Sequence, residues 1–330
     1  MTYVETLNEA YPNPSLYGGK GSNLIKMLKL GIRVPPGFLV NTIAYKKFIN
    51  DSPLKEEIYS TLGNDYKPKD VIALSTKIKN FFLTSKIPHE IMKEIKKKFT
   101  DIYKKIGKEN SFSVRSSANI EDTSNFSFAG QAESYLNKIT LEEILEAIKN
   151  CWISLYSPNA LLYLLQMRKN KIKISLNDLK MAVIIQKMVK SQVSGVLFTA
   201  NVLNNKMDEM LINSTWGLGE TITSNLIIPD LIILNKQKFE IIRTVIGDKE
   251  KSSVSNPKGS STILIPTEQN LKESYSLNES QLFKLYKLGL KLEKCLNYPQ
   301  DIEWAIEDNK IYTLQSRPIT TLRKGGILRV

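Results

Sequence analysis

The segment Asp301-Ile-Glu-Trp-Ala-Ile-Glu-Asp-Asn-Lys-Ile-Tyr-Thr-Leu-Gln-Ser-Arg-Pro318 decides the interpretation of this chain. Apolar and polar residues alternate on both sides of Asp308-Asn309-Lys310, which predicts two strands joined by a turn. A three-residue loop would pair Trp304 with Leu314 on one apolar face. A two-residue loop would mix apolar and polar side chains on both faces, which a half-buried sheet disfavours.

The same register gathers polar side chains on the other face of the hairpin. Glu303 lies opposite Gln315, and Asp301 lies opposite Arg317. Mg²⁺ prefers oxygen ligands, and arginine can bind phosphate oxygens through two parallel hydrogen bonds. This face therefore suits a divalent metal and a phosphate, although a surface hairpin with a solvated salt bridge fits the segment equally well.

The composition is that of a soluble globular protein with room for two or more lobes. The chain has 330 residues, of which 42% are hydrophobic and 24% are charged. No apolar run reaches the roughly 18 residues of a membrane span. The first residues lack the basic start and the apolar stretch of a signal peptide. We therefore expect a cytoplasmic protein that does not bind membranes.

Residue counts argue against several classes of site. Cys151 and Cys295 are isolated, so neither a zinc motif nor a disulfide framework is visible. The single histidine, His89, excludes multi-histidine metal sites and argues against a Ser-His-Asp triad. It opens a helical pattern, so we expect it at the start of a surface helix. The net charge of +13 comes from dispersed lysines without interleaved aromatic residues, so nucleic acid is not the expected partner.

The order of patterns predicts the α+β class. Residues 1–180 mix helices with few strands, and residues 181–320 are rich in antiparallel strand patterns, with a tail at 321–330. Residues 181–189 and 195–201 read as a β-hairpin at the start of the second lobe.

A glycine-rich segment, Gly18-Gly19-Lys20-Gly21, precedes an amphipathic helical pattern. Glycines let main-chain N–H groups approach an anion, and a helix N-terminus favours negative charge. The spacing differs from that of a P-loop. A plain tight turn explains the segment as well as an anion site does.

Two later segments combine small residues with charge. Val114-Arg-Ser-Ser-Ala118 and the following Phe128-Ala-Gly-Gln131 fit an arginine at a strand end followed by a lid that excludes water from a phosphoryl group. A Ser-rich surface loop is the alternative. Trp216-Gly-Leu-Gly-Glu220 offers a second glycine pair beside a carboxylate, or a turn with Trp216 in the core.

These segments occur in a characteristic order along nearly the whole chain. The full set is Gly18–Gly21, Val34-Pro-Pro-Gly-Phe38, Val114–Ala118, Phe128–Gln131, Ser194-Gly-Val-Leu-Phe198, Trp216–Glu220, Pro229-Asp230, Asp301–Trp304 and Leu314-Gln-Ser-Arg-Pro318. In this respect the chain resembles the N-terminal, nucleotide-binding part of the phosphoenolpyruvate synthase and pyruvate phosphate dikinase family, a part that rifampicin phosphotransferases share.

The resemblance implies an ATP-grasp fold, in which two lobes with antiparallel sheet enclose an ATP cleft with Mg²⁺ at the phosphates. It implies that Lys20, Arg115 and Arg317 are catalytic phosphate-binding residues. The remaining expected contacts are Gly19 at ATP, Gly130 and Ser134 in a lid near residues 116–134, Gln186 in the nucleotide pocket, and Glu303 and Gln315 at Mg²⁺.

The chain departs from the family pattern at three points. Asn225 replaces a glycine, and asparagine tolerates left-handed backbone geometry. Ser134 replaces a common threonine and keeps the hydroxyl. Full-length members carry a swivelling domain with a phosphoryl-accepting histidine, whereas His89 lies in no such motif.

Three functions therefore stay open. The first is the ATP-cleaving component of a dikinase, a Mg-ATP-dependent phosphotransferase that passes a phosphoryl group to a histidine on a separate domain or protein. The second is a stand-alone kinase that phosphorylates a small molecule directly. The third is a non-catalytic nucleotide- or nucleic-acid-binding module, against which the intact Lys20, Arg115, Glu303, Gln315 and Arg317 argue. The acceptor, the nucleotide product and the oligomeric state are not specified.

Overall fold

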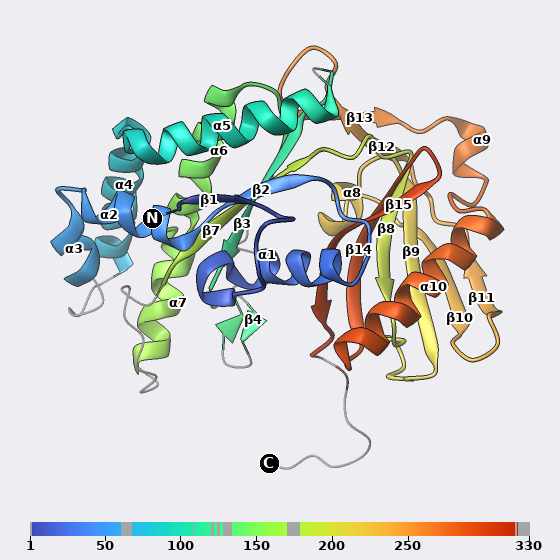
Figure 1. Cartoon of the computed structure of the whole chain (residues 1–330). Helices are drawn as coiled ribbons and strands as arrows, with labels where there is room; N and C mark the ends of the chain where they lie inside the picture. Colours follow the sequence, from blue (N-terminus) through green and yellow to red (C-terminus); the bar gives the residue numbers. More distant parts are fainter. Residues whose placement is uncertain are drawn as a thin grey trace. The chain divides into compact units, whose positions relative to one another are not determined.

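The computed structural model describes residues 2–60, 68–107, 109–119, 122–123, 126–127, 134–169, 179–320 and 322 (Figure 1). Helices and antiparallel sheets alternate along the described chain, which confirms the α+β class. The chain forms two compact units. Unit 1 comprises Met1–Lys26 and Pro36–Met188, and unit 2 comprises Met27–Pro35 and Val189–Val330.

Unit 1 is built on a five-stranded antiparallel sheet. Its strands lie in the order β1 (Val4–Thr6), β2 (Gly37–Val40), β7 (Met181–Lys187), β3 (Phe112–Ala118) and β6 (Ser134–Lys138). The helices are α1 (Pro14–Lys29), which continues into unit 2, α2 (Thr42–Asn50), α3 (Lys55–Ser60), α4 (Pro68–Thr84), α5 (His89–Ile106), α6 (Leu141–Ser154) and α7 (Pro158–Lys169). Two short strands, β4 (Asp122–Thr123) and β5 (Phe126–Ser127), pair with each other.

Strand β7 lies at the centre of this sheet, and the expected hairpin of 181–189 with 195–201 is therefore wrong. Every residue from Met181 to Gln186 is buried, because β2 and β3 flank the strand on both edges and side chains cover both of its faces. A strand that is apolar on both faces belongs inside a sheet. The boundary between the units consequently lies after Met188 rather than near residue 180.

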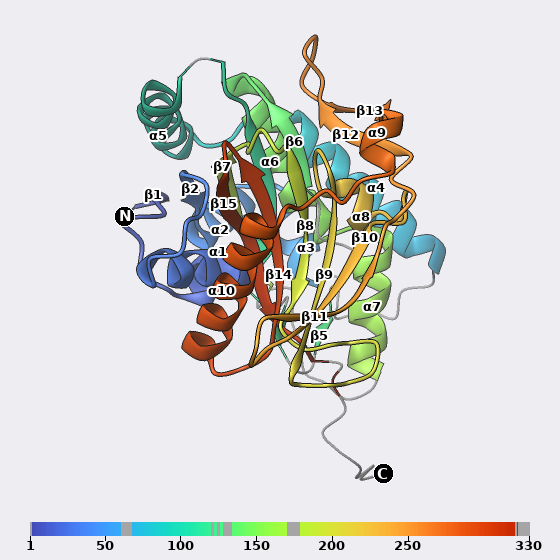
Figure 2. The ribbon, with the colours of Figure 1, turned by 90° about the vertical axis from the view of Figure 1, so that its right-hand side faces the viewer.

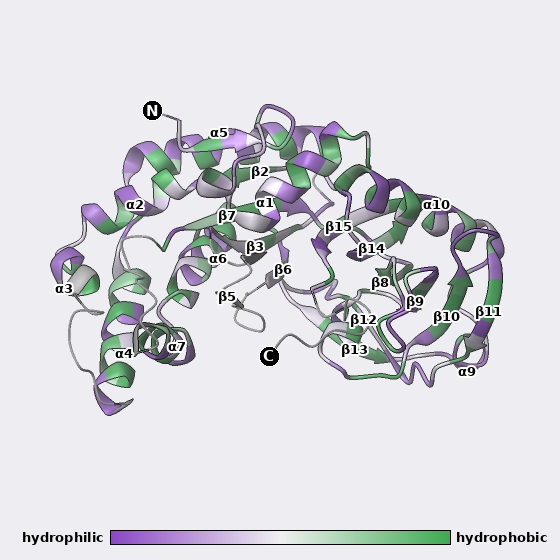
Figure 3. Cartoon of the chain, turned by 90° about the horizontal axis from the view of Figure 1, so that it is seen from below, coloured by the Kyte–Doolittle hydropathy of each residue, from purple (hydrophilic) through white to green (hydrophobic). Residues whose placement is uncertain are grey.

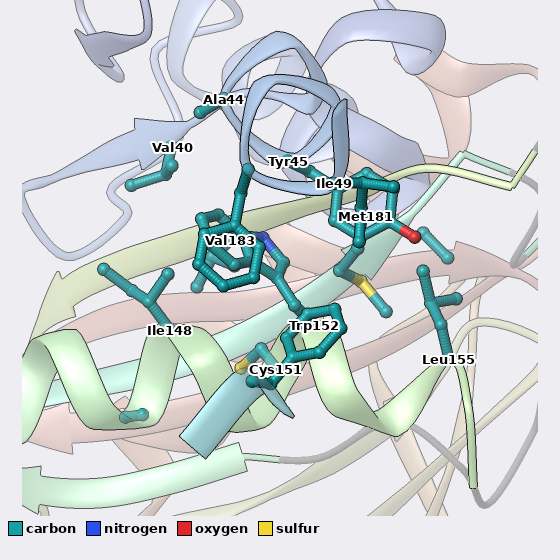
Figure 4. Close-up of a cluster of buried hydrophobic side chains, with 14 of the residues drawn as sticks. Val40, Ala44, Tyr45, Ile49, Ile148, Cys151, Trp152, Leu155, Met181 and Val183 are labelled. Atoms are coloured by element: carbon teal, nitrogen blue, oxygen red, sulfur yellow. The ribbon is translucent and has the colours of Figure 1, made fainter. Parts of the chain in front are cut away.

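Helices form the main hydrophobic core of unit 1 against one face of the sheet. Trp152 of α6 lies beside Tyr45 and Ile49 of α2 and Val183 of β7 (Figure 4). The ring centroids of Phe48 and Trp152 are 5.1 Å apart. Helix α6 begins with a capping box between Thr140 and Glu143, which satisfies two backbone N–H groups at its first turn.

Helix α5 shows the amphipathic pattern that the sequence predicts. Ile91, Ile95 and Ile102 are buried, and lysines occupy the outer side, so hydrophobic and hydrophilic colours alternate along the helix (Figure 3). His89 is its first residue and is exposed, as expected. Within the described residues, no helix is both long and apolar enough to cross a membrane.

Unit 2 is built on a six-stranded antiparallel sheet (Figure 2). Its strands lie in the order β11 (Glu240–Val245), β10 (Asp230–Asn235), β9 (Glu209–Trp216), β8 (Val193–Phe198), β14 (Gln300–Glu307) and β15 (Lys310–Pro318). A two-stranded sheet pairs β12 (Lys251–Ser255) with β13 (Thr262–Pro266). The helices are α8 (Glu220–Thr223), α9 (Gln269–Lys272) and α10 (Glu279–Leu296), and α10 packs against β8 and β14.

Trp304 anchors the centre of this sheet. Its side chain is fully buried, and its register partner on β8 is Gly195. A Cβ atom at Gly195 would lie 2.6 Å from Trp304 Cζ2 and 2.0 Å from the Asn213 carbonyl oxygen. The glycine of the Ser194–Phe198 segment is therefore required by the close approach of the indole ring and the neighbouring backbone.

A buried ion pair ties the end of β10 to two other segments of unit 2. Asp230 and Lys249 are both fully buried, and Lys249 Nζ donates to Asp230 Oδ1. The Asp230 carboxylate also accepts from the Gly247 N–H at 3.0 Å, from the Ser276 N–H at 2.8 Å and from Ser276 Oγ at 2.7 Å. The charge of the Asp230 carboxylate is thus hydrogen-bonded at both oxygens, as a buried carboxylate requires.

Candidate functional site

The glycine-rich segment is held against strand β3. Gly18 interrupts α1 with φ 70° and ψ 177°, so a new helical stretch starts after it. A Cβ atom at Gly18 would lie 2.1 Å from the Ser117 carbonyl oxygen, which explains why glycine occupies this position. The Ser117 hydroxyl accepts from the Gly21 N–H at 3.0 Å and donates to the Tyr17 carbonyl at 2.8 Å.

Lys20 lies beside the strand that carries Arg115. Its Nζ donates to the Ser116 carbonyl at 3.5 Å. The structure thus brings together two motifs that are 96 residues apart in the sequence. Cationic side chains and the backbone N–H groups of a helix start are groups that favour bound phosphate oxygens.

Arg115 lies on the face of the unit 1 sheet opposite the helical core. Its register partners are Ile184 on β7 and Ser134 on β6. Ser113, two residues before Arg115, is paired with Gln186, so Arg115 and Gln186 share this face. Gln186 is 2% exposed, whereas Ser134 is exposed at the strand start. Arg115, Gln186 and Ser134, three of the expected residues of unit 1, therefore lie on one face of the sheet.

The expected lid between residues 116 and 134 is described only in part. Strands β4 and β5 form a short antiparallel pair within it. Gly130 lies outside the described residues. Its expected contact with nucleotide stays a prediction.

The hairpin of β14 and β15 in unit 2 has a shorter turn than expected. Glu307 pairs with Lys310, so the loop consists of Asp308 and Asn309, whose φ values are 50° and 58°. Two residues with positive φ are typical of a two-residue hairpin turn. The predicted three-residue loop, and with it the pairing of Trp304 with Leu314, is wrong.

A β-bulge restores the predicted register at the other end of the hairpin. Trp304 pairs with Thr313, whereas Glu303 pairs with Gln315, so Leu314 is an extra residue on β15. Beyond the bulge the predicted pairs are confirmed. Without it, Gln315 would lie opposite Ile302, which is fully buried on the core face.

The polar face predicted from alternation is present on this hairpin. Glu303 is half-buried opposite Gln315, which is 8% exposed. Register partners on antiparallel strands have Cβ atoms about 4.5–5.5 Å apart. The Arg317 guanidinium donates to Asp301 Oδ2 from Nε and Nη2, each at 2.9 Å. Carboxylate, amide and guanidinium thus lie in adjacent rows of one face.

Electrostatics around Asp301 reflect its burial. Desolvation raises the pKa of the Asp301 carboxyl, the Arg317 charge and hydrogen bond oppose this shift, and the Glu303 carboxylate adds to it. Two acidic side chains on one face favour a nearby cation. Arg317 supplies part of that positive charge.

The oxygen donors of this face fit a magnesium ion. Glu303 contributes a carboxylate and Gln315 an amide oxygen, the donor types that Mg²⁺ accepts. In the described part of the chain, no group of three or more His, Cys, Asp or Glu side chains could hold a metal by itself. Mg²⁺ commonly uses one or two protein oxygens and takes the rest from phosphates and water, so the small donor set is suitable.

The Trp216–Glu220 segment is fixed by Ser194, which belongs to the Ser194–Phe198 segment, and by Ser253, which sequence reasoning did not select. Ser194 Oγ donates to the Gly217 carbonyl at 2.7 Å, and Leu218 N–H donates to the Ser253 carbonyl at 2.8 Å. Ser253 Oγ also donates to Glu220 Oε1. Ser253 belongs to a stretch that reads as a polar loop, so the sequence carried no signal for it. Asn225 has φ 52°, which confirms the expected left-handed geometry.

Sequence comparison provides independent information on this chain. Residues 14–326 match the family model described as "Pyruvate phosphate dikinase, AMP/ATP-binding domain". A probable phosphoenolpyruvate synthase of Methanocaldococcus jannaschii is 35% identical over 98% of this chain and 27% of its own length. The phosphoenolpyruvate synthase of Pyrococcus furiosus is 34% identical over 94% of this chain and 42% of its own length.

The chain therefore spans less than half the length of these two relatives. Among solved structures, D-alanyl-alanine synthetase A from Vibrio cholerae aligns with a TM-score of 0.30 and 12% identity, covering 92% of this chain and 55% of that one. At that TM-score the alignment does not establish a shared fold.

Proposed function

The chain belongs to the pyruvate phosphate dikinase AMP/ATP-binding domain family, and from this premise we propose that it is the ATP-cleaving component of a phosphoenolpyruvate synthase-like dikinase with an ATP-grasp fold. It would pass a phosphoryl group from ATP to a histidine on a separate domain or protein, with AMP and phosphate as the other products. The observation that carries the proposal is the hairpin register, which sets Glu303 opposite Gln315 beside the Asp301–Arg317 pair.

The proposed residue roles follow from charge and hydrogen-bonding chemistry. Lys20 and Arg115 neutralise phosphate oxygens, and the Gly19 backbone approaches the phosphates. Gln186, Ser134 and Gly130 contribute to nucleotide binding. Phosphoryl transfer depends chiefly on positioning and charge neutralisation, so a cluster of this kind can supply most of the catalysis.

Glu303 and Gln315 would hold Mg²⁺ through their oxygen atoms. A bound Mg²⁺ supplies charge neutralisation at the phosphate oxygens. Arg317 would bind the terminal phosphate, and Asp301 orients its guanidinium through the two hydrogen bonds described above. The guanidinium fork suits phosphate geometry better than a lysine ammonium would.

The second candidate is direct transfer to a small molecule. The two candidates predict different nucleotide products. A dikinase yields AMP, whereas a direct kinase yields ADP.

The deciding experiment identifies that product. The protein is incubated with Mg²⁺ and ATP, with and without the histidine-bearing swivelling domain of a relative, and the nucleotides are separated by chromatography. We expect Mg²⁺-dependent ATP binding by the protein alone and AMP formation with the added domain. ADP formed with a small-molecule acceptor would select the second candidate, and absence of Mg²⁺-dependent ATP binding would refute both.

A matched pair of variants tests the role of the hairpin. Glu303→Gln should lower AMP formation by about a hundredfold or more, since removing one group that stabilises transition-state charge costs about 10²–10³ in rate. Glu240→Gln makes the same chemical change on the exposed edge strand of the same sheet and should leave the rate unchanged. Equal rates of AMP formation for the two variants would refute a role of Glu303 in the site.

A further inference from the structure

The hydroxyl of Ser117 links the glycine-rich segment to the arginine strand. It is 0% exposed, it accepts from the Gly21 N–H at 3.0 Å and it donates to the Tyr17 carbonyl at 2.8 Å. We propose that Ser117 is a positioning residue that holds Gly18–Gly21 in a fixed offset from Arg115. This inference rests on the proposed function, in which both segments bind the phosphates of ATP.

The contact replaces a helix cap that the segment cannot provide for itself. The first turn of a helix leaves N–H groups without intrahelical acceptors, and a side-chain oxygen at the preceding residue usually accepts one of them. That residue here is Gly18, which has no side chain. Any Cβ atom there would collide with the Ser117 carbonyl, 2.1 Å away.

The close approach and the cap are therefore two parts of one arrangement. Glycine allows the helix start to touch β3, and the strand then supplies the missing oxygen from a residue 96 positions along the chain. Both hydrogen-bonding functions of the hydroxyl are used, one as donor and one as acceptor. The substitution Ser117→Ala would remove both hydrogen bonds and would change the side chain in no way other than the loss of the hydroxyl.

Further contacts fix the preceding residues of the segment but do not reach β3. Thr42 Oγ1 donates to the Ser15 carbonyl at 2.8 Å, and the Tyr17 hydroxyl donates to Glu5 on β1. Burial and this hydrogen bond raise the pKa of Tyr17, so the phenol keeps its proton and remains the donor. These tethers align the segment with α2 and β1, whereas Ser117 aligns it with the strand of Arg115.

The alignment matters because the glycine-rich segment carries Lys20 and β3 carries Arg115. Lys20 Nζ lies 3.5 Å from the carbonyl of Ser116, the residue after Arg115. A rigid link keeps the two segments in place before a phosphate arrives, and such preorganisation reduces the ordering cost of binding.

The test compares Ser117→Ala with Ser75→Ala in the full chain. Ser75 is also buried in unit 1, and its Oγ donates to the Tyr156 carbonyl at 2.6 Å, so Ser75→Ala loses a comparable hydrogen bond away from the glycine-rich segment. Amide hydrogen exchange at Gly21 is measured without nucleotide. The Kd for a non-hydrolysable ATP analogue is measured with Mg²⁺.

We expect Ser117→Ala to speed exchange at Gly21 and to weaken analogue binding about tenfold, the size of one lost hydrogen bond to a positioned group. Ser75→Ala should match the wild type in both measurements. Unchanged exchange at Gly21, or unchanged Kd in Ser117→Ala, would overturn the inference. If the wild type binds no analogue, the proposed function fails, and the exchange result alone then decides whether Ser117 anchors the segment.

Discussion

The buried ion pair of unit 2 offers a strong test of how the structure is stabilised. Replacing Asp230 by asparagine keeps the size of the side chain but removes the negative charge that faces Lys249, whose side chain is 0% exposed. Removing one partner of a buried pair leaves an uncompensated charge and costs about 3–5 kcal/mol. The asparagine NH₂ group would also face the N–H donor of Gly247 or that of Ser276, depending on which carboxylate oxygen it replaces. We therefore expect Asp230→Asn to lower the free energy of unfolding by an amount in the upper part of that range.

The control is an ion pair of similar chemistry in solvent. Asp51 lies 3.0 Å from Lys47, and their side chains are 48% and 36% exposed. Solvent screens this pair, so Asp51→Asn should cost about 1 kcal/mol or less. The difference between the two variants isolates the effect of burial.

Urea unfolding followed by tryptophan fluorescence measures both variants, since Trp216 and Trp304 lie in unit 2 with Asp230 and Trp152 lies in unit 1 with Asp51. The double variant Asp230→Asn with Lys249→Met should be more stable than Asp230→Asn alone, because methionine leaves no buried charge. The reasoning is refuted if Asp230→Asn lowers the free energy of unfolding no more than Asp51→Asn does. It is also refuted if the double variant is no more stable than Asp230→Asn alone.

Two other predictions concern single side chains. Gly195→Ala should destabilise unit 2 by about 3 kcal/mol or more, because the new methyl group meets Trp304 and the Asn213 carbonyl. Thermal unfolding measures this loss, and a midpoint temperature equal to that of the wild type would contradict the prediction. Glu9→Gln should remove a stabilisation that depends on pH. A hydrogen bond from Lys98, then those from Thr6, lowers the pKa of Glu9 from 4.5 to about 2, so Glu9 stabilises the fold above pH 4.5 and loses this effect as the pH falls towards 2. Because the Glu9 side chain is 58% exposed, the free energy of unfolding should differ between variant and wild type by at most about 1 kcal/mol at pH 6. This difference should become steadily smaller in unfolding measurements at lower pH, and a difference that stays constant would contradict the assignment.

Alternation of residue types predicted the pairing at the polar end of the closing hairpin but not its turn. Glu303 opposite Gln315 and Asp301 opposite Arg317 follow from the requirement that Ile302 and Trp304 face the core. The turn was mispredicted because alternation assumes a regular ladder. A bulge at Leu314 adds one residue to β15, and no residue type in the segment signals it.

The place of β7 was mispredicted for a related reason. A short apolar run identifies a strand without identifying the strand's neighbours. Met181–Lys187 pairs with β2 and β3, which lie far away in the sequence, so local spacing could not reveal the sheet to which it belongs. Non-local pairing of this kind is decided by packing in the folded chain.

In unit 1 the candidate site residues were selected by their motifs, whereas the contacts that support them were not. Lys20, Arg115 and Ser117 stand in recognisable segments, but the hydrogen bonds of Ser117 with Tyr17 and Gly21 join positions about 100 residues apart. The same holds for Ser253 at Glu220. Serines are common in polar loops, so only the folded structure distinguishes a support from a solvated side chain.

The bulge in the closing hairpin also has a consequence for how the protein can evolve. The extra residue, Leu314, lies between the turn and the pair of Glu303 with Gln315, so the register of this pair differs from the register next to the turn. Loss of that residue would yield a regular ladder with the same pair still opposed. Deletion of Leu314 alone should therefore leave the residues on the polar face with their partners, so this one position can be lost without moving the pair.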